Sequence, residues 1–265
     1  MDNIKIGLQL HSVREDFKED PINTLKRVKA MGYTGVEFSS GNITNMNENL
    51  ADKSAEFFKD ALKEVGLECY GILTSWTNIL PENIEETIKY NKEVGSPFLV
   101  IGSVPPDLVT NIEEANSTIE YMKEVLERLK KENITTGYHN HDTDFLNVIE
   151  GKTFFEHVFD NTPDDFVMLL DTGNAAAGGF DPIELIKKYP NRSPFLHIKG
   201  YSKEKGYLAY IGRDDLDWKE VVNCAREVGG AKVFDIEFGT RGDYEPFERA
   251  ETNYKYVSEL TKNLK

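Results

Sequence analysis

One complete unit of the fold can be recognised in residues 51–73, ADKSAEFFKDALKEVGLECYGIL. Phe58, Leu62 and Val65 recur at the spacing of one face of an amphipathic helix. Gly66 follows at once, and glycine favours the left-handed conformation in which many helices end. The apolar stretch over 67–73 then has the length of a buried strand. The segment therefore predicts a helix over 51–65, a glycine stop and a strand over 67–73.

The same order of helix, glycine and strand recurs, with Gly32, Gly66 and Gly95 spaced 34 and 29 residues apart. Such a period with alternating element types is typical of repeated βα units. Eight pairs of this kind predict an α/β fold, a single (β/α)8 TIM barrel domain over residues 1–265. A doubly wound sheet is the main alternative, but no Gly-x-Gly-x-x-Gly follows the first strand. We expect strands over 4–10, 33–38, 67–73, 97–101, 134–139, 166–171, 194–198 and 232–238, and helices over 21–31, 51–65, 82–94, 112–131, 150–159, 182–189, 216–228 and 246–263.

The composition excludes several classes of partner. A formal net charge of −15 disfavours binding to nucleic acid, because an acidic surface repels phosphate backbones. No apolar run approaches the roughly 18 residues that a membrane-spanning helix needs, and no secretory signal is visible, so we expect a cytoplasmic protein without a membrane partner. In that compartment Cys69 and Cys224 are expected as reduced thiols rather than as a disulfide. Assembly into a homo-oligomer stays open.

Polar residues end four of the strands expected in the second half of the chain: His139, Asp171, His197 and Glu237. An unpaired charge at the end of a buried strand is costly, so each needs a partner. Active sites of (β/α)8 barrels lie at this end of the strands. Two imidazoles and two carboxylates suit one divalent metal ion, and the pattern does not choose among Mn, Zn, Co, Fe and Mg. We predict that the four residues bind this metal jointly.

Three of these residues also have a named structural alternative. Asp171 could cap the next helix, His197 could be a structural histidine, and Glu237 could belong to a salt bridge. Alternation along the last strand places Glu237 on the same face as Asp235, with Phe234 on the opposite face. We therefore expect the aromatic face to pack on helices and Glu237 to point into the barrel mouth.

Taken together, these strand ends resemble the xylose isomerase-like barrels, the sugar phosphate isomerase/epimerase superfamily that also contains endonuclease IV. The resemblance covers nearly the whole chain. No single motif is diagnostic, whereas the ordered set is quite specific. Its markers are GLQLHSVR at 7–14, GVEF at 35–38, YHNHD at 138–142, LDTGN at 170–174, LHIK at 196–199 and IE at 236–237.

The resemblance implies a metal held by Glu, Asp, His and Glu on the fifth to eighth strands. Asp171, His197 and Glu237 match this set, whereas His139 stands where the first Glu would be. Related members carry a similar His-Asn-His run.

In epimerases of this family the two metal-bound glutamates act as acid and base on opposite sides of the substrate. Only Glu237 of that pair remains here, as the expected base. We therefore expect Asp144 to be the second proton carrier, with a loop-capping aspartate as the alternative. His141 is the other candidate carrier, and it is also expected to bind substrate. Without a second carrier, the chemistry would be one-base isomerisation or elimination.

Further residues are expected at the substrate. Lys199 shares a strand face with His197 and is expected to pair with a developing oxyanion, unless it extends to solvent. Glu37 is expected to bind substrate hydroxyls, with a salt bridge to a loop lysine as the alternative. Trp76 would cover the apolar face of a sugar or simply pack in the protein. Arg213 lies in a loop that could bind a phosphate or carboxylate of the substrate, or be a flexible surface loop.

These observations favour a metal-dependent isomerase or epimerase acting on a sugar, a sugar phosphate or a related keto-polyol by proton transfer next to a metal-bound carbonyl. The alternative is a metal-dependent lyase that dehydrates a keto-polyol or a cyclic hydroxy acid in the same barrel. A DNA-repair endonuclease would need more His and Glu ligands than the five His of this acidic chain suggest. A metal-free, non-catalytic barrel is the remaining hypothesis. The expected partner is a small molecule.

Overall fold

A closed parallel barrel forms the centre of the computed structural model, which describes residues 4–40, 53–239 and 245–262. The sheet order is β8-β5-β4-β3-β2-β1-β10-β9. A parallel bridge between Asp171 and His197 joins the two ends of this order, supported by a hydrogen bond of 3.0 Å from His197 N to Leu170 O. The predicted (β/α)8 barrel is therefore confirmed. Its strands are β1 (Lys5–Gln9), β2 (Gly35–Ser40), β3 (Glu68–Thr74), β4 (Leu99–Ile101), β5 (Gly137–His139), β8 (Val167–Leu169), β9 (Phe195–Lys199) and β10 (Val233–Glu237).

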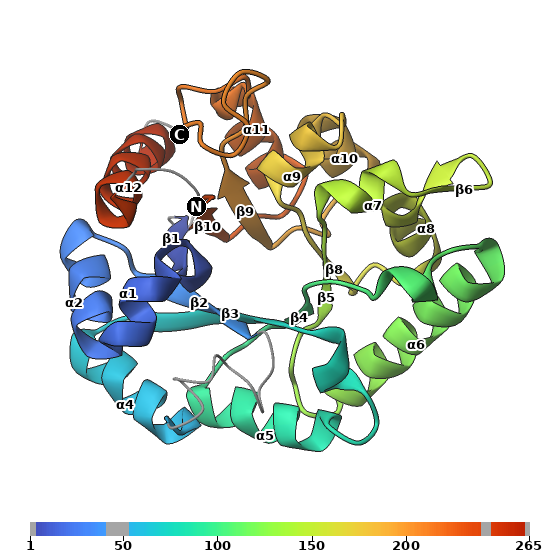
Figure 1. The fold of residues 1–265 in the computed structure, drawn as a ribbon, viewed down its shortest axis with the longest axis horizontal. Helices are drawn as coiled ribbons and strands as arrows, with labels where there is room; N and C mark the ends of the chain where they lie inside the picture. Colours follow the sequence, from blue (N-terminus) through green and yellow to red (C-terminus); the bar gives the residue numbers. More distant parts are fainter. Residues whose placement is uncertain (1–3, 41–52, 240–244, 263–265) are drawn as a thin grey trace.

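A ring of helices surrounds the barrel (Figure 1). Three of them end at the predicted glycines, and Gly32, Gly66 and Gly95 have φ values of 108°, 77° and 84°. No helix within the described ranges is both long and apolar enough to cross a bilayer. The helices are α2 (Pro21–Met31), α4 (Ala55–Val65), α5 (Ile84–Val94), α6 (Ile112–Lys130), α8 (Phe154–Asn161), α10 (Pro182–Lys188), α11 (Trp218–Glu227) and α12 (Pro246–Lys262).

Two helix starts differ by four residues from the sequence-based expectation. Helix α4 begins at residue 55 because the Ser54 side chain accepts a hydrogen bond of 3.1 Å from Phe57 N, and residues 51–52 lie outside the described chain. Helix α8 begins at residue 154, not 150. A small hairpin of β6 (Val148–Ile149) and β7 (Lys152–Thr153) precedes it, with a turn at residues 150–151 in left-handed conformation.

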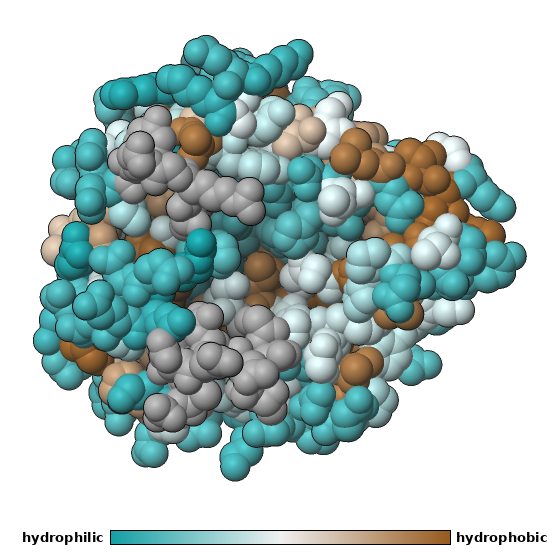
Figure 2. Space-filling view, viewed as in Figure 1, coloured by the Kyte–Doolittle hydropathy of each residue, from teal (hydrophilic) through white to brown (hydrophobic). Residues whose placement is uncertain are grey.

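Short elements follow several barrel strands and line the carboxyl end of the barrel, which we call the mouth. Periodicity did not predict them, because each contains only three to six residues. They are η1 (Leu10–Val13), α1 (Arg14–Glu19), η2 (Trp76–Ile79), η3 (Pro106–Leu108), α7 (Asp142–Leu146) and α9 (Thr172–Ala177). Figure 2 shows a hollow near the middle of this face, with mostly hydrophilic residues around it.

Alternation along the strands separates two apolar layers. Phe234 and Ile236 belong to the core between barrel and helices, as predicted. Inside the barrel, a smaller cluster contains Tyr70, Val100, Leu169, Phe195 and Val233. Since Phe195 and Val233 begin their strands, this cluster fills the amino end of the barrel, and the inward-facing polar residues lie between it and the mouth.

Candidate metal centre

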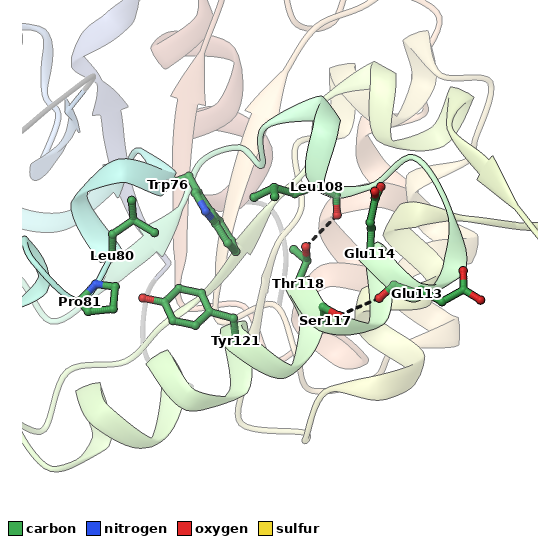
Figure 3. A pocket seen from close by; sticks show the side chains of 9 residues that line it. All are labelled: Trp76, Leu80, Pro81, Leu108, Glu113, Glu114, Ser117, Thr118 and Tyr121. Atoms are coloured by element: carbon green, nitrogen blue, oxygen red, sulfur yellow. Dashed lines mark hydrogen bonds between the residues drawn. The ribbon is translucent and has the colours of Figure 1, made fainter.

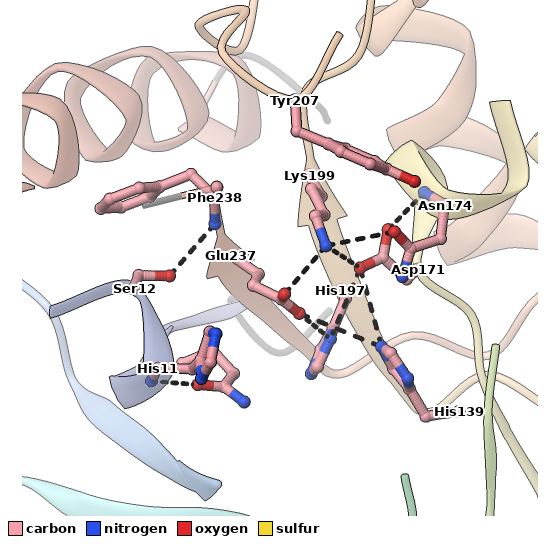
Figure 4. Close-up of polar contacts among 12 residues, drawn as sticks. His11, Ser12, His139, Asp171, Asn174, His197, Lys199, Tyr207, Glu237 and Phe238 are labelled. Atoms are coloured by element: carbon pink, nitrogen blue, oxygen red, sulfur yellow. Dashed lines mark hydrogen bonds and ion pairs between the residues drawn. The ribbon is translucent and has the colours of Figure 1, made fainter. Parts of the chain in front are cut away.

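His139, Asp171, His197 and Glu237, here called the quartet, meet at the mouth (Figure 4). Each offers one nitrogen or oxygen atom, and these four atoms all lie within 4.8 Å of one another. His139 Nε2 lies 3.6 Å from Asp171 Oδ2 and 4.0 Å from Glu237 Oε2. His197 Nδ1 lies 2.9 Å from Glu237 Oε2 and 4.0 Å from Asp171 Oδ2. All four side chains are buried, so the fold brings the four residues together away from solvent.

The donor atoms of the quartet fit a divalent metal ion. By hydrogen-bond geometry none of the four has a partner within the described chain, although ion-pair contacts join His197 Nδ1 to Glu237 Oε2 at 2.9 Å and Asp171 Oδ2 to Lys199 Nζ at 3.3 Å. Buried lone pairs without a partner are costly, so the arrangement calls for a bound species. Ligands about 2.1 Å from a tetrahedral metal lie about 3.4 Å apart, which is within the range of separations seen here. Two imidazoles and two carboxylates thus form a cluster that could hold a metal such as Zn, Mn, Co or Fe.

Glu37 orients one of the two imidazoles. Its Oε2 lies 2.8 Å from His197 Nε2, and neither side chain has any exposed surface. Because a carboxylate accepts and does not donate, the Nε2 proton points to Glu37. The lone pair of His197 Nδ1 is then left facing the quartet. A carboxylate behind a metal-binding histidine has this effect in many metal sites.

When no cation is bound, a proton on His197 compensates the negative charge of the neighbouring carboxylates. Burial alone would lower the pKa of His197, but the Glu37 and Glu237 carboxylates raise it well above its ordinary value of 6.5. The imidazolium then lies between two carboxylates. A metal ion that binds at Nδ1 must displace this proton, so metal affinity should fall as the pH falls.

Lys199 places a positive charge beside the two carboxylates of the quartet. Its Nζ lies 2.9 Å from Glu237 Oε1, 3.3 Å from Asp171 Oδ2 and 3.2 Å from Asn174 Oδ1. Burial would lower the pKa of Lys199, but the Asp171 and Glu237 carboxylates raise it above 10.5. For Glu237 the effects are reversed: burial would raise its pKa, but Lys199 and His197 hold this pKa well below 4.5. Lys199 is thus an ammonium beside an ionised Glu237, close to the quartet, and its expected role toward a substrate oxyanion stays a prediction.

Asp171 caps a helix with one carboxylate oxygen and offers the other to the quartet. Its Oδ1 caps α9 by accepting a hydrogen bond of 2.7 Å from Asn174 N, while Oδ2 faces the quartet. Asn140 Oδ1 accepts a hydrogen bond of 2.8 Å from Asp171 N, and Asn140 Nδ2 donates to Asp171 O at 3.1 Å. The ends of β5 and β8 are therefore tied together directly beneath two members of the quartet.

Asp144 lies outside the quartet. Its Oδ1 accepts a hydrogen bond of 2.9 Å from Tyr138 Oη, and its Oδ2 accepts one of 2.7 Å from His141 N. Burial raises its pKa to about 6. Oδ2 caps the start of α7 and Oδ1 is engaged by the Tyr138 hydroxyl, so the geometry supports the loop-capping alternative over the proton carrier. His141 does lie beside the quartet, with its ring centroid 5.0 Å from that of His139, and burial lowers its pKa to about 4.

Glu37 is deeper than the sequence suggested. Strand β2 continues to residue 40, and its pairing with β3 shifts between Val36 and Glu37. Glu37 is therefore an interior residue beneath His197 instead of a strand-end residue open to substrate hydroxyls. It is accompanied by Asp235, whose two oxygens have no hydrogen-bond partner among the described residues. Burial, then the charge of Glu37, raises the pKa of Asp235 well above 3.8.

Trp76 and Arg213 are not brought to the quartet. Trp76 lines a separate pocket of about 400 Å³ between η2 and the start of α6, and its ring centroid lies 5.6 Å from that of Tyr121 (Figure 3). Arg213 is exposed, with its guanidinium carbon 5.8 Å from the centroid of the Tyr210 ring. Neither residue has a polar contact with the quartet in the part of the chain that the structure describes.

Three residues at the mouth were not expected from the sequence: His11, Asn174 and Tyr207. Asn174 binds Lys199, and the Tyr207 ring lies over it, with its centroid 4.9 Å from Lys199 Nζ (Figure 4). His11 follows the first strand by two residues, in η1. A polar residue just beyond an apolar strand was the signal for the quartet, and the same signal could have identified His11.

Comparison with solved structures shows the same architecture. A sugar phosphate isomerase/epimerase from Parabacteroides distasonis has 24% sequence identity and a TM-score of 0.78, over 97% of this chain and 94% of that chain. An L-ribulose 3-epimerase has 14% identity and a TM-score of 0.70, over 98% and 95% of the two chains. The IOLI protein with a bound zinc atom has 16% identity and a TM-score of 0.71, over 98% of each chain. At these identities the likeness concerns the fold.

Curated relatives match only in part. An inosose dehydratase from Geobacillus kaustophilus is 33% identical over 76 residues, which are 28% of this chain and 24% of the relative. One from Clostridium perfringens is 30% identical over 115 residues, or 43% of this chain and 37% of the relative. The chain therefore spans about a third of the length of these relatives. The family description "Xylose isomerase-like TIM barrel" matches residues 25–263, so the chain belongs to that family.

Proposed function

We propose that this xylose isomerase-like TIM barrel protein is a metal-dependent isomerase or epimerase. Its substrate would be a sugar, a sugar phosphate or a related keto-polyol, and the reaction would transfer a proton next to a carbonyl group. The observation that carries the proposal is the quartet, in which four buried nitrogen and oxygen atoms lie within 4.8 Å of one another. Membership of the family agrees with it.

In this proposal the quartet holds one divalent cation. When bound, the cation acts as a Lewis acid toward a substrate carbonyl and its neighbouring hydroxyl. Glu237 is the base that takes the proton from carbon, because its ionised carboxylate lies at the mouth. Lys199 is a fixed positive charge beside that carboxylate and stabilises negative charge that develops on substrate oxygen.

Glu37 and Asn174 would be positioning residues. Glu37 fixes the ring of His197, and Asn174 holds Lys199 from the first turn of α9. These contacts support a rigid constellation, which proton transfer requires because misplacement by about 1 Å can cost about a hundredfold in rate.

A second candidate function is a metal-dependent lyase that dehydrates a keto-polyol such as an inosose. The partial matches to two inosose dehydratases favour this candidate. Its first step is the same removal of a proton next to a carbonyl. The two functions differ in the second step, because the lyase loses a hydroxyl group as water whereas the isomerase returns a proton to carbon.

The test starts with metal analysis of the purified protein and of protein stripped with a chelator. Mn, Co, Zn, Fe or Mg is then added back, and transfer of deuterium from D₂O into ketoses, aldoses, their phosphates and an inosose is followed by NMR. Deuterium entry with an intact carbon skeleton and all hydroxyls supports the isomerase, and loss of water supports the lyase. Glu68→Gln is the matched control for Glu237→Gln, because Glu68 is exposed on the surface in an ion pair with Lys5. Metal-free protein that works as well as the loaded form would refute the proposal.

A further inference from the structure

His11 stands at the mouth next to Glu237. Strand β1 lies beside β10, with Leu8 opposite Ile236, so the turn that follows β1 emerges beside the end of β10. This turn is η1, and the Gln9 side chain fixes its start by accepting a hydrogen bond from His11 N. In Figure 4 the His11 ring faces the opening from the first-strand side, with the quartet across from it. The side chain is exposed, so a substrate in the mouth could reach it.

Arg14 sets the protonation of this imidazole. Its Nη1 lies 3.2 Å from His11 Nε2, and a guanidinium can only donate. Nε2 is therefore the acceptor, and the ring is neutral with its proton on Nδ1. The charged groups that face the ring are Glu237, Arg14, Lys199 and Glu15. Partial burial against the walls of the mouth is the main cause that lowers the pKa of His11 below 6.5. Arg14 and Lys199 lower this pKa further, and Glu237 raises it.

Interconversion of an aldose and a ketose moves two hydrogens, one between carbons and one between oxygens. In the proposed function Glu237 carries the first. Lys199 is held as an ammonium by two carboxylates, and both oxygens of Asp144 accept hydrogen bonds, one from Tyr138 Oη and one from His141 N. The imidazoles of His141, whose ring centroid lies 5.0 Å from that of His139, and of His11 are the candidates that remain in the described mouth. The oxygen-bound proton needs another carrier.

We propose that His11 is the second acid–base residue of this site and carries the proton between the two substrate oxygens. This inference rests on the proposed function. As Glu237 takes the proton from carbon, the C–H electron pair becomes the C=C bond of an enediol, and the carbonyl oxygen takes the proton from His11 Nδ1. Nδ1 then accepts the proton of the neighbouring hydroxyl, whose oxygen becomes the new carbonyl, and Glu237 returns its proton to the other carbon. The ring is neutral again at the end, and Arg14 at Nε2 stabilises it while it lacks a proton.

The experiment compares His11→Asn with wild type in D₂O, using the sugar that wild type converts. Asn keeps a polar group near Nδ1 but cannot carry a proton. We expect net isomerisation to fall about 100-fold or more, in the range of general acid–base effects, while deuterium exchange at carbon through Glu237 falls much less. Co²⁺ binding should stay within about twofold, because His11 lies outside the quartet. Glu68→Gln, at an exposed position outside the mouth, is the control and should leave both reactions unchanged.

A second variant tests the pairing of His11 with Arg14, and its first readout, the pKa of the His11 ring, does not depend on turnover. Arg14→Met removes a group that lowers the pKa of His11, so this pKa, followed by NMR of the ring, should rise, and the acid limb of kcat/KM should move to higher pH with it. Normal isomerisation by His11→Asn would overturn the inference, as would loss of Co²⁺ binding together with both reactions. An unchanged His11 pKa in Arg14→Met would overturn it as well. Absence of deuterium exchange in metal-loaded wild type would instead refute the proposed function, so the two failures can be told apart.

Discussion

Replacing Glu37 by Gln removes one negative charge beneath the proposed metal site while keeping the size and an acceptor oxygen. The contact of 2.8 Å with His197 Nε2 lies where neither side chain is exposed, so solvent cannot replace the lost charge. Loss of a partner behind a metal-binding histidine typically weakens metal affinity about 10- to 100-fold. That factor corresponds to about 1.4 to 2.7 kcal/mol. We expect this loss when metal affinity is measured at the high end of the accessible pH range, where protons compete least for His197.

The pH dependence of the same variant makes the prediction sharper. Glu37 raises the pKa of His197, so wild-type metal binding must displace a proton, and affinity falls as pH falls. In Glu37→Gln this pKa drops, the competing proton is held less tightly, and affinity should depend less on pH. The gap between variant and wild type should therefore narrow toward about pH 5.5.

Co²⁺ titration followed by absorbance, across this pH range, measures both effects. Glu68→Gln is the matched control, since it exchanges the same groups at an exposed position. Circular dichroism establishes that the variants are folded. Equal affinities of Glu37→Gln and wild type at high pH, or a constant gap at all pH values, would refute the assignment of Glu37 to His197.

Three further outcomes are expected. Glu237→Gln should stay folded, lose metal content and fall in turnover by about a hundredfold or more, measured by elemental analysis and the deuterium assay; near-normal turnover contradicts the role of the base. His139→Ala should weaken Co²⁺ binding. Asp144→Asn should keep Co²⁺ binding and lower the free energy of unfolding by about 1 kcal/mol, because only one of the two acceptor oxygens used by Tyr138 Oη and His141 N remains. The opposite pattern of Co²⁺ binding would make Asp144 the ligand. Gly7→Ala would place a Cβ 2.1 Å from Asp235 Oδ1, so urea unfolding should show a loss of about 1–3 kcal/mol, and an unchanged midpoint would show that the barrel interior can adjust.

The repeating part of the fold could be predicted because its signals are local. Helix faces, strand lengths and the glycines after α2, α4 and α5 are determined within one βα unit, and the barrel follows from their number. The hairpin before α8 could not be predicted in this way. Its strands have two residues each, and its turn depends on the left-handed conformation of Glu150 and Gly151. Such short elements carry no measurable period.

The quartet could be recognised because each residue ends an apolar strand, but the partners of individual atoms could not. Glu37 and His197 are 160 positions apart, and only the curvature of the closed barrel brings them into contact. Asp144 illustrates the converse limit. A position five residues beyond His139 is compatible with both an open carboxylate and a helix cap, and the hydrogen bond from His141 N to Asp144 Oδ2 decides for the cap. Sequence patterns identify chemical groups at a site, whereas hydrogen-bond geometry decides what each group does.

The junction of β8 and β9 has a consequence for how this barrel stays closed. These two strands are the edges of the sheet order, and along the described chain they meet mainly through the bridge between Asp171 and His197. Short pairing at an edge leaves backbone groups prone to exchange with water or to pair with another chain. Since Asp171 and His197 both belong to the quartet, a cation held there would cross-link the two edges, and at a concentration 1,000 times its Kd it would add about 4 kcal/mol to stability. Amide hydrogens at this junction would then report directly on cation occupancy, so integrity of the barrel and readiness for catalysis would depend on the same ion.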